Sequence, residues 1–362
     1  MKILHILEDY SLNSGGLRTV VEQLNRKLIE SGVDSYIIST EKEPNDAIFS
    51  VQSSYKPWRY SNLLKSKLIK LINENKITIF HIHGVWMYPQ FIAAKVALKY
   101  KIPFIISPHG MYEPWLWLNG TLKKKFYFKF LAEPIFSKSK AIHAITNEEN
   151  QNIKRLFPKI NVIEIPNLID YNAFSIIKTN SVCAEKYILF MGRIDKKKGI
   201  DVLIKAFAKL KINNLKLIIA GALTSYKIEL DNLISSVNCT DDVIFAGRVT
   251  GNEKVELYKN ALVFVAPSHS EVIGMVNLEA AVLKVPVITT YQTGLKKEWN
   301  ANGGILINPN EDELYLALSE VLSWNHAKRI EMGAKLSRFV FENYSTEKQF
   351  KKWVELYKNL SL

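Results

Sequence analysis

The chain alternates short apolar runs with longer segments in which apolar residues recur every three or four positions. Runs such as Lys2–Leu7 and Leu215–Ala220 have the length and the β-branched content of buried strands. Segments such as residues 17–31 place their apolar residues on one helical face. Strand, loop and helix follow one another repeatedly, and this order predicts an α/β protein built on parallel sheets.

The same pattern divides the chain into two halves. A strand that ends in Pro166-Asn167-Leu168-Ile169-Asp170 is followed by residues 171–186, which are polar and lack a clear period. We therefore expect one domain over residues 1–169 and a second over residues 170–344. Amphipathic segments at 327–343 and 346–360 predict two final helices.

Composition narrows the class of protein. A length of 362 residues with 48% hydrophobic content suits two globular domains, and two cysteines are too few for a disulfide framework or a metal cluster. No apolar run approaches the roughly 20 residues of a transmembrane helix, and the N-terminus enters a strand directly, so we expect a cytoplasmic protein. The net charge of +13 implies an anionic partner: nucleic acid, phospholipid or a phosphorylated substrate.

Residues 261–290 carry the most informative chemistry. Two short β-branched runs flank a segment with helical spacing, which predicts a strand, a loop, a helix and a strand. Such a unit sets the helix N-terminus at the carboxyl edge of a parallel sheet, where a phosphate is favoured. Glu271 and Glu279 lie on either side of that position and suit hydroxyl groups, as a sugar nucleotide would offer. Two solvated glutamates around a buried helix would give the same spacing.

This segment resembles the Glu-x7-Glu motif of the retaining glycosyltransferases of family 4. The resemblance implies that Glu271 faces the donor sugar and that Glu279 faces the ribose. It also implies donor contacts at the start of the helix, at Ile273, Gly274, Met275 and Val276. Two departures from the usual pattern stand out: Val272-Ile273 where Gly-Phe is common, and Lys284 where a glycine often precedes the strand.

The family resemblance extends over almost the whole chain and implies the GT-B fold. In that fold two Rossmann-like, doubly wound parallel-sheet domains face a cleft. The resemblance makes the first domain the acceptor side and the second the nucleotide-sugar side. It also implies that residues 345–362 form a helix that crosses back onto the first domain.

A second glycine-containing loop supplies cations. The strand at residues 187–191 leads into Gly192-Arg193, and Lys198-Gly199 follows. Fixed cations aimed at a departing diphosphate lower the barrier without a metal, and the resemblance gives this role to Arg193 and Lys198. An isolated basic loop would more commonly be a solvated charge run, but this loop is paired with the two glutamates. The resemblance also implies that the loop after the strand at 243–249 lines the base, with Arg248 and Val249.

The first half offers a weaker set of candidates. Gly15 and Gly16 follow the first strand, where the resemblance implies a loop near donor phosphate, although a plain turn has the same sequence. Ser-Pro-His-Gly-Met at 107–111 resembles a family segment whose histidine contacts the transferred sugar, which would be His109. His81 and His83 share one face of a strand, but no acidic or cysteine ligand is spaced nearby, so we expect cleft or core histidines and no metal site.

The segment from residue 112 to residue 140 interleaves aromatic residues with lysines. Six lysines and one acid between 121 and 140 give a net charge of +5. The mixture suits an anionic membrane surface, where a lipid-linked acceptor would be found, and single-stranded nucleic acid would suit it too. A core helix with a solvated lysine face is the third interpretation. We assign five of these residues to the acceptor and membrane side: Trp115, Trp117, Lys123, Lys124 and Lys125.

These observations favour a retaining, metal-independent hexosyltransferase without a cofactor, which uses a UDP- or GDP-linked donor. The expected acceptor is a glycan, polyprenyl-diphosphate-linked, in bacterial surface polysaccharide assembly at the inner face of the cytoplasmic membrane, with no nucleic acid bound. One alternative is a basic nucleic-acid- or membrane-binding protein on an inactive GT-B scaffold. Another is a sugar-nucleotide epimerase or hydrolase.

Overall fold

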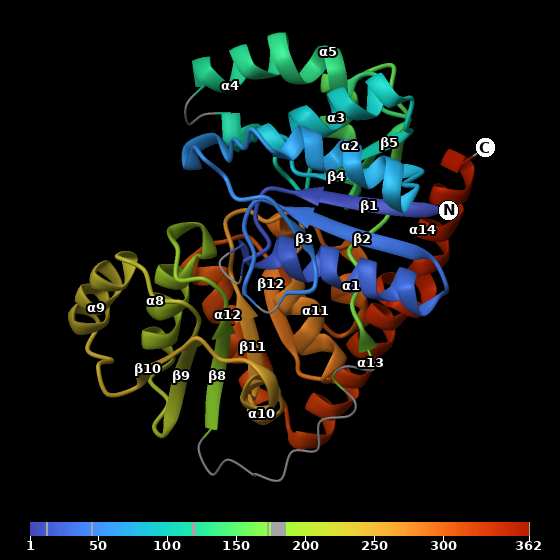
Figure 1. Cartoon of the computed structure of the whole chain (residues 1–362). Coiled ribbons are helices and arrows are strands. Elements are labelled where there is room, and N and C mark those ends of the chain that lie inside the picture. The colour runs from blue at the N-terminus through green and yellow to red at the C-terminus, as the bar shows by residue number, and fades with distance from the viewer. Residues whose placement is uncertain (12–13, 45, 118–120, 172–173, 175–185, 362) are drawn as a thin grey trace. The chain divides into compact units, whose positions relative to one another are not determined.

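A computed structural model describes residues 1–11, 14–44, 46–117, 121–171, 174 and 186–361, with only the backbone at Trp115, Thr121 and Ser361. The chain forms two compact units (Figure 1). Unit 1 contains Met1–Leu168 and Gln349–Leu362, and unit 2 contains Ile169–Lys348. The division lies one residue before the boundary expected at 169, and the return to unit 1 begins at 349 rather than 345.

Unit 1 is built on a seven-stranded parallel sheet with the order β3-β2-β1-β4-β5-β6-β7. The strands are β1 (Lys2–Leu7), β2 (Asp34–Ser39), β3 (Phe49–Ser50), β4 (Ile79–His83), β5 (Phe104–Ser107), β6 (Ala141–Ala144) and β7 (Val162–Glu164). The order runs outward from β1 in one direction and outward from β4 in the other. The carboxyl ends of β1 and β4 therefore flank the switch point at which doubly wound sheets bind ligands.

Helices cover both faces of this sheet (Figure 1). They are α1 (Gly16–Glu30), α2 (Leu64–Asn75), α3 (Tyr88–Tyr100), α4 (Thr121–Tyr127), α5 (Glu133–Phe136), α6 (Asn147–Leu156) and α14 (Thr346–Ser361). Side chains such as Leu4 and Phe80 pack towards α2 and α3 on one face. Their neighbours Ile3 and Ile79 pack towards α1 and α14 on the other. Because both faces are covered, the strands are mostly apolar and do not alternate with polar residues, as the sequence predicts.

The aromatic and basic segment of unit 1 is a chain of short helical pieces. The 3-10 turn η3 (Pro114–Trp117) precedes α4, and the π-helical turn η4 (Phe128–Ala132) joins α4 to α5. Phe128 and Phe136 are buried in the unit 1 core. Leu122, Phe126 and Phe130 are exposed instead. The segment therefore has an inner apolar face and an outer apolar face, which the sequence pattern alone does not separate.

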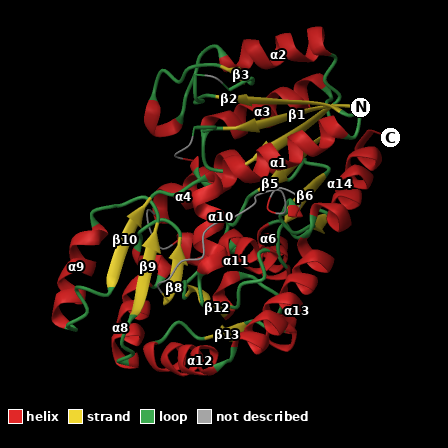
Figure 2. Ribbon diagram, turned by 90° about the horizontal axis from the view of Figure 1, so that it is seen from below, coloured by secondary structure: helices red, strands yellow, loops and turns green. Residues whose placement is uncertain are grey.

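Unit 2 repeats the architecture with a six-stranded parallel sheet in the order β10-β9-β8-β11-β12-β13. The strands are β8 (Lys186–Met191), β9 (Leu215–Ala220), β10 (Val243–Gly247), β11 (Val263–Ala266), β12 (Val287–Thr290) and β13 (Ile305–Ile307). Figure 2 shows β8, β9 and β10 side by side. The switch point of this sheet lies between β8 and β11.

The helices of unit 2 are α8 (Ile200–Leu210), α9 (Tyr226–Ser236), α10 (Gly251–Asn260), α11 (Met275–Val282), α12 (Glu311–Ser323) and α13 (His326–Tyr344), with short 3-10 turns η5 (Lys196–Lys198), η6 (Tyr291–Thr293) and η7 (Lys297–Asn302). Helices α8, α9 and α12 supply the apolar core on one face of the sheet. Helix α14 begins in unit 2, and its residues from Gln349 onward belong to unit 1.

The expected α/β architecture of two Rossmann-like parallel sheets is confirmed. Helices α2, α3 and α9 are not predicted from the sequence pattern. In α3 apolar residues occupy nearly every position, because the helix is buried on several sides, so the period that marks a surface helix is absent.

Candidate functional site

The loop after β8 is held against the loop after β11 by a glycine. Gly199 has a φ of 66°, and a Cβ atom there would lie 2.1 Å from the backbone oxygen of Pro267. Only glycine combines this backbone conformation with such a close approach. The turn η5 is capped by Asp195, whose side chain accepts a hydrogen bond from the Lys197 N–H at 3.1 Å. These contacts set Lys198 beside the segment that follows β11.

Lys198 and Glu271 form a largely buried ion pair. The Lys198 Nζ lies 2.6 Å from the Glu271 Oε1, and their side chains are 16% and 11% exposed. Ser268 Oγ donates to the same carboxylate oxygen at 2.6 Å. The Glu271 backbone N–H donates to the Gln292 oxygen at 2.8 Å, which fixes the loop. In the part of the chain that the structure describes, Glu271 Oε2 has no partner, so it is available to a ligand hydroxyl.

Glu279 lies in α11 and is bound by two side chains of α10. Lys254 Nζ is 2.8 Å from its Oε1, and the Tyr258 hydroxyl donates to its Oε2 at 2.9 Å. Burial, and then the Glu279 charge, raise the pKa of Tyr258 well above its usual value, so this hydroxyl stays a donor. Each carboxylate oxygen keeps a second lone pair for a further donor such as a ribose hydroxyl.

The remaining predicted donor residues lie along the same edge of the unit 2 sheet. Arg193 follows β8 with a 61% exposed side chain, and its Nη2 lies 3.7 Å from Asp195 Oδ2. No contact joins it to the two glutamates within the described ranges. Gly192 precedes it, and at the end of β10 Arg248 is exposed while Val249 is buried. The structure thus pairs Lys198 with Glu271 and leaves Arg193 and Arg248 open to solvent.

The loop before α11 is tightly packed. A Cβ at Gly274 would lie 2.3 Å from the Asn277 Nδ2, so a side chain there is excluded. Ile273 is buried, whereas Met275 and Val276 in the first turn of α11 are partly exposed. The first N–H groups of a helix have no intrahelical acceptor, and no side chain caps α11. A donor could therefore reach the start of this helix at Met275 and Val276, as predicted for them, because these two residues are partly exposed.

In unit 1 the glycine loop after β1 is open. Gly15 and Gly16 are exposed, and a Cβ at either position would meet no atom within 4 Å. Gly15 has a φ of 64°, a conformation that glycine adopts without strain. The Ser14 hydroxyl donates to the Ser11 oxygen at 2.9 Å. The loop leaves room for a ligand to approach the backbone, but nothing in its packing requires one.

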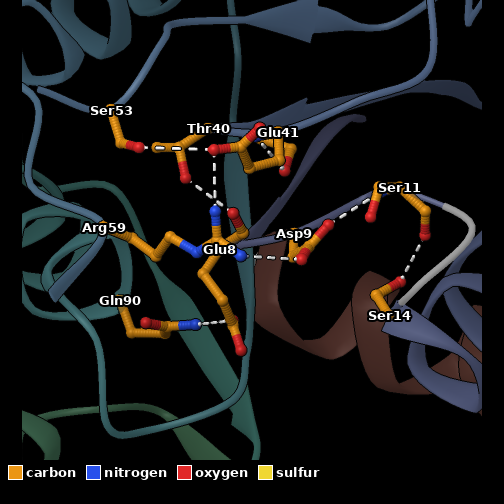
Figure 3. Close-up of polar contacts among 10 residues, drawn as sticks. Glu8, Asp9, Ser11, Ser14, Thr40, Glu41, Ser53, Arg59 and Gln90 are labelled. Atoms are coloured by element: carbon orange, nitrogen blue, oxygen red, sulfur yellow. Dashed lines mark hydrogen bonds and ion pairs between the residues drawn. The ribbon is translucent and has the colours of Figure 1, made fainter. Parts of the chain in front are cut away.

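A polar group follows the end of β1 (Figure 3). Arg59 bridges two carboxylates, with Nη1 2.7 Å from Glu41 Oε1 and Nη2 2.9 Å from Asp9 Oδ2. Glu8 points away from this bridge and accepts a hydrogen bond from Gln90. Burial raises the pKa of Glu8. The switch point of unit 1 thus presents a buried carboxyl that did not emerge from the sequence.

Histidines form a line that begins at the predicted residue His109. The His109 Nε2 lies 2.9 Å from His83 Nδ1, and His83 Nε2 lies 2.9 Å from His5 Nδ1. His5 and His83 are fully buried, and His109 is partly exposed. Burial lowers the pKa of His5 to about 3, so the ring is neutral at physiological pH.

A second buried line crosses the same sheet. The Tyr357 hydroxyl lies 2.7 Å from His81 Nδ1, and His81 Nε2 lies 2.7 Å from Ser107 Oγ. Ser107 Oγ lies 2.9 Å from His143 Nδ1, and His143 Nε2 donates to the Ile165 oxygen at 2.7 Å. This line ties α14 to β4, β5 and β6.

Nitrogens of His5, His81 and His83 lie within 4.8 Å of one another, so proximity alone would allow them to meet one ion. Both nitrogens of His81 and both of His83 are already hydrogen-bonded. The group is therefore organised by hydrogen bonds, in keeping with the expectation of core and cleft histidines.

The residues predicted for the acceptor side divide into two kinds. Lys123 and Lys125 are exposed. Trp117 is partly buried and packs on the unit 1 core, and Lys124 donates to the Leu116 oxygen at 2.5 Å. Trp117 and Lys124 are therefore turned partly inward, because a helical segment turns one side towards the core. The side chain of Trp115 lies outside what the structure describes.

Several residues of these sites were not found from the sequence: Lys254, Tyr258, Ser268, His5, Glu8, Gln90 and His143. A histidine inside an otherwise apolar strand was the available signal for His5 and His143. Lys254 and Tyr258 stand four positions apart on one helix, and this spacing places them on one side of it. Their partner Glu279 could not be deduced from that spacing.

Comparison with known proteins identifies the family. The family model described as Glycosyl transferases group 1 matches residues 174–336, and the model of Glycosyltransferase Family 4 matches residues 14–173. Together they span both units. The chain belongs to the family 4 glycosyltransferases. Its fold is accordingly GT-B.

Among known members, an uncharacterised glycosyltransferase of Methanocaldococcus jannaschii is 29% identical over 81% of this chain and 78% of its own. The capsular polysaccharide biosynthesis glycosyltransferase CapM of Staphylococcus aureus is 34% identical over 39% of this chain and 40% of its own. The structure of Anabaena HepE in complex with UDP-glucose superposes with a TM-score of 0.79 at 15% identity, and covers 99% of this chain and 100% of its own. That likeness shows the fold.

None of the helices in the described part of this glycosyltransferase is long and apolar enough to span a membrane.

Proposed function

We propose that this glycosyltransferase moves a hexosyl group, with retention and without a metal, from a UDP- or GDP-linked sugar to a lipid-linked glycan acceptor in surface polysaccharide assembly. The observation that carries the proposal is the ion pair of Lys198 and Glu271 at the switch point of the unit 2 sheet. A cation and a carboxylate held together there suit a sugar diphosphate, because the cation can bind the diphosphate and the carboxylate can accept hydrogen bonds from the sugar hydroxyls.

Lys198 would stabilise the departing diphosphate. Its ammonium group has three donors, so it can hold Glu271 and still donate to a phosphate oxygen. Arg193 is exposed on the same loop and would supply a second cation. Negative charge builds on the leaving oxygen as the glycosidic bond breaks, and fixed cations lower that barrier without reorganisation. The start of α11 adds unpaired N–H groups and the positive end of the helix dipole.

Two carboxylates would orient the rest of the donor. Glu271 Oε2 is unpartnered among the described residues and suits a hydroxyl of the sugar. Glu279, held by Lys254 and Tyr258, suits the ribose hydroxyls. The base would lie near Arg248 and Val249, and His109 would contact the transferred sugar. The diphosphate oxygen itself would accept the proton of the acceptor hydroxyl.

The relatives support the class of donor and of pathway. HepE is described in complex with UDP-glucose, and CapM is described as a capsular polysaccharide biosynthesis enzyme. We extend both to this chain as part of the proposal.

An exposed apolar stripe supports the membrane side of the proposal. Leu122, Phe126 and Phe130 follow one another at intervals of four residues and are 85%, 63% and 64% exposed. The exposed lysines 123, 125 and 129 surround them. Apolar side chains within a basic surface suit the interface of an anionic bilayer.

The donor is tested by a thermal-shift panel of UDP-glucose, UDP-N-acetylglucosamine, UDP-galactose and GDP-mannose. A ligand at 100 times its Kd stabilises the fold by about 2.7 kcal/mol. The Glu279→Gln variant should lose this shift, and a matched exposed variant, Glu320→Gln, should keep it. No shift with any sugar nucleotide, together with salt-dependent retention on nucleic acid, would favour the inactive basic scaffold.

Product analysis then tests the reaction. The proposal expects an α-linked product from an α-linked donor, unchanged rates with EDTA, and little turnover without acceptor. An inverted linkage, or loss of activity on chelation, contradicts the retaining, metal-independent part. Donor consumption without acceptor indicates a hydrolase or epimerase instead.

The membrane side is tested by flotation with vesicles that contain phosphatidylglycerol. Replacing Leu122, Phe126 and Phe130 by serine should release the protein. Leu316→Ser is the control, because Leu316 is also exposed, at 65%, but lies on α12 of unit 2. Equal flotation of the triple variant and the unaltered protein would rule out this surface as the docking face.

A further inference from the structure

The histidine lines of unit 1 differ in one respect that bears on His109. In the line through Tyr357, the carbonyl oxygen of Ile165 can only accept a hydrogen bond. His143 therefore carries its hydrogen on Nε2, and Ser107 donates to His143 Nδ1. His81 in turn donates from Nε2 to Ser107 and accepts from Tyr357. Every polar atom in this line is paired, and its direction is fixed at the carbonyl end.

The line of His109, His83 and His5 has no such carbonyl. Three neutral rings carry three hydrogens, two of which occupy the two hydrogen bonds. The third hydrogen lies at one end, on His5 Nε2 or on His109 Nδ1. The two arrangements differ in the tautomer of all three rings, and the surroundings of the two end nitrogens decide between them.

The buried end favours one arrangement. His5 Nε2 is buried without a hydrogen-bond partner among the described residues. Buried N–H groups without an acceptor are rarer in proteins than buried acceptors without a donor. A hydrogen on His5 Nε2 would be such an orphan. His109 Nδ1, by contrast, has no protein partner in the described structure and belongs to a partly exposed residue. The third hydrogen therefore belongs on His109 Nδ1.

We propose that His5 and His83 are positioning residues that hold His109 as its Nδ1–H tautomer, so that it presents a hydrogen-bond donor to an oxygen of the transferred sugar. His5 donates from Nδ1 to His83 Nε2, and His83 donates from Nδ1 to His109 Nε2. The ring of His109 is thereby fixed at one nitrogen and available at the other. This inference rests on the proposed function, because it takes His109 to face the sugar.

The backbone around His109 is held for the same purpose. His109 has a φ of 53°, a left-handed conformation that costs a residue other than glycine about 1–3 kcal/mol. Glu149 holds the loop, because its Oε1 accepts the Gly110 N–H at 2.6 Å and its Oε2 accepts the Ile145 N–H at 2.7 Å. A strained backbone conformation that neighbouring residues hold in place is typical of a functional residue whose side chain needs a fixed orientation.

The polar group of Glu8 and Gln90 also contacts the strand end that carries His83. Gln90 Nε2 donates to the His83 backbone oxygen at 2.8 Å and to the Glu8 carboxyl group. A Cβ on Gly84 would lie 2.9 Å from Gln90 Nε2 and 3.3 Å from the Met111 side chain. The backbone that carries His83 is therefore closely packed and hydrogen-bonded at the end of β4.

The first test is the 15N NMR spectrum of the full-length protein labelled at histidine. Protonated and bare imidazole nitrogens resonate far apart, so each tautomer is read directly. The inference expects Nδ1–H rings at His5, His83 and His109 and Nε2–H rings at His81 and His143, each assigned by its loss in a single His→Gln variant. An Nε2–H ring at His109 would overturn it, as would metal-shifted resonances together with zinc in the purified protein.

The second test adds UDP-glucose or UDP to the same sample, with GDP-mannose and GDP as the alternative pair. The His109 Nδ1 resonance should move with the sugar nucleotide and stay in place with the nucleoside diphosphate. A resonance that moves equally with both contradicts a sugar contact. If no nucleotide binds, the proposed function fails, whereas the spectrum of the free protein still decides the tautomers.

The third test compares two replacements of His83 in the transfer reaction. The amide nitrogen of an asparagine takes the place of Nδ1 and can donate to His109, whereas a leucine cannot. His83→Leu should lower kcat by about 10- to 100-fold with little change in the donor KM, because one hydrogen bond that positions the reacting sugar is lost. His83→Asn should recover most of that loss.

Tyr357→Phe is the matched control. It removes a buried hydroxyl that donates to His81, whose ring centroid lies 3.9 Å from that of His83. It should lower the melting temperature and leave kcat unchanged. A fall in kcat equal to that of His83→Leu, or an Asn variant that folds normally yet is as slow as the Leu variant, would reduce His83 to a packing role.

Discussion

Units 1 and 2 carry the same arrangement of strands around a central switch point, and they place different chemistry at it. Unit 2 places charged groups there, with Lys198 paired to Glu271 and Lys254 paired to Glu279. Unit 1 places neutral imidazoles near its switch point, in two hydrogen-bonded lines, beside the group in which Arg59 bridges Glu41 and Asp9. A shared fold thus fixes where a ligand can approach, while the side chains of each unit decide which chemical groups are offered to it.

The glycine loops give the sharpest contrast in packing. Gly199→Ala in unit 2 would drive a Cβ against the Pro267 oxygen in a left-handed conformation, and should cost about 3–5 kcal/mol of stability. Gly15→Ala in unit 1 meets open space, so only the backbone conformation of φ 64° and ψ −127° opposes a side chain, and it should cost about 1–3 kcal/mol. Urea unfolding of both variants measures the difference. Equal losses would mean that the two loops are packed alike.

The charged site predicts a large kinetic effect. Lys198→Ala should lower kcat/KM for transfer by about 100-fold or more, because it removes a cation from the leaving diphosphate and leaves Glu271 without its partner. Lys209→Ala is the control, since Lys209 forms only exposed ion pairs with Glu311 and Asp312. Similar rates in both variants would remove the basis for assigning the diphosphate to this loop.

The neutral site predicts acid sensitivity in unit 1. Burial lowers the pKa of His5 to about 3 and that of His143 to about 4, from the usual 6.5. The unfolded chain therefore binds more protons between pH 6.5 and these values, and stability falls as the pH falls through that window. Two further buried histidines, His81 and His83, have pKa values shifted in the same direction.

Buried carboxyls of unit 1 oppose this effect. Burial raises the pKa of Glu113 and of Glu149 to about 7 and also raises that of Glu8, so the folded state gains protons first and is stabilised on acidification between about pH 7 and 4.5. Five histidines of unit 1 have lowered pKa values, since burial also lowers that of His109 to about 3, and they outnumber the three carboxyls, so a net loss of stability is expected as the pH falls from 7.5 to 5. Hydrogen exchange should show earlier opening in unit 1 than in unit 2, where both histidines, His269 and His326, are exposed. A unit 2 that opens first would break the comparison.

The smallest expected effect concerns the exposed cation of unit 2. Arg193→Ala should change the free energy of unfolding by less than about 0.5 kcal/mol, because its side chain is 61% exposed and its contact with Asp195 is long. Its effect on transfer should be far larger, since the proposal gives it a role only when diphosphate is bound. Denaturant unfolding and initial rates separate the two. A stability loss comparable to the loss in rate would indicate a structural residue.

Much of the charged site of unit 2 could be predicted from the sequence, because its residues lie in short strand, loop and helix segments that the sequence pattern reveals. Glu271 and Glu279 belong to one strand, loop and helix, and Lys198 belongs to another that starts from the neighbouring strand. Loops that follow adjacent parallel strands meet at one edge, so the Lys198 contact could be anticipated. The tyrosine and lysine that hold Glu279 could not be anticipated, because they lie on a separate helix, α10, and only packing decides which of its sides meets α11.

The sequence by itself determined the two α/β halves, the strands and the loops that carry the charged residues, since apolar period and turn chemistry act over a few residues. Only the tertiary structure decided the histidine lines. They join residues 26, 78 and 276 positions apart, and they depend on strand register and on the seating of α14. A histidine in an apolar strand indicates a buried polar group, but its hydrogen-bond partner is chosen by packing that brings distant segments together.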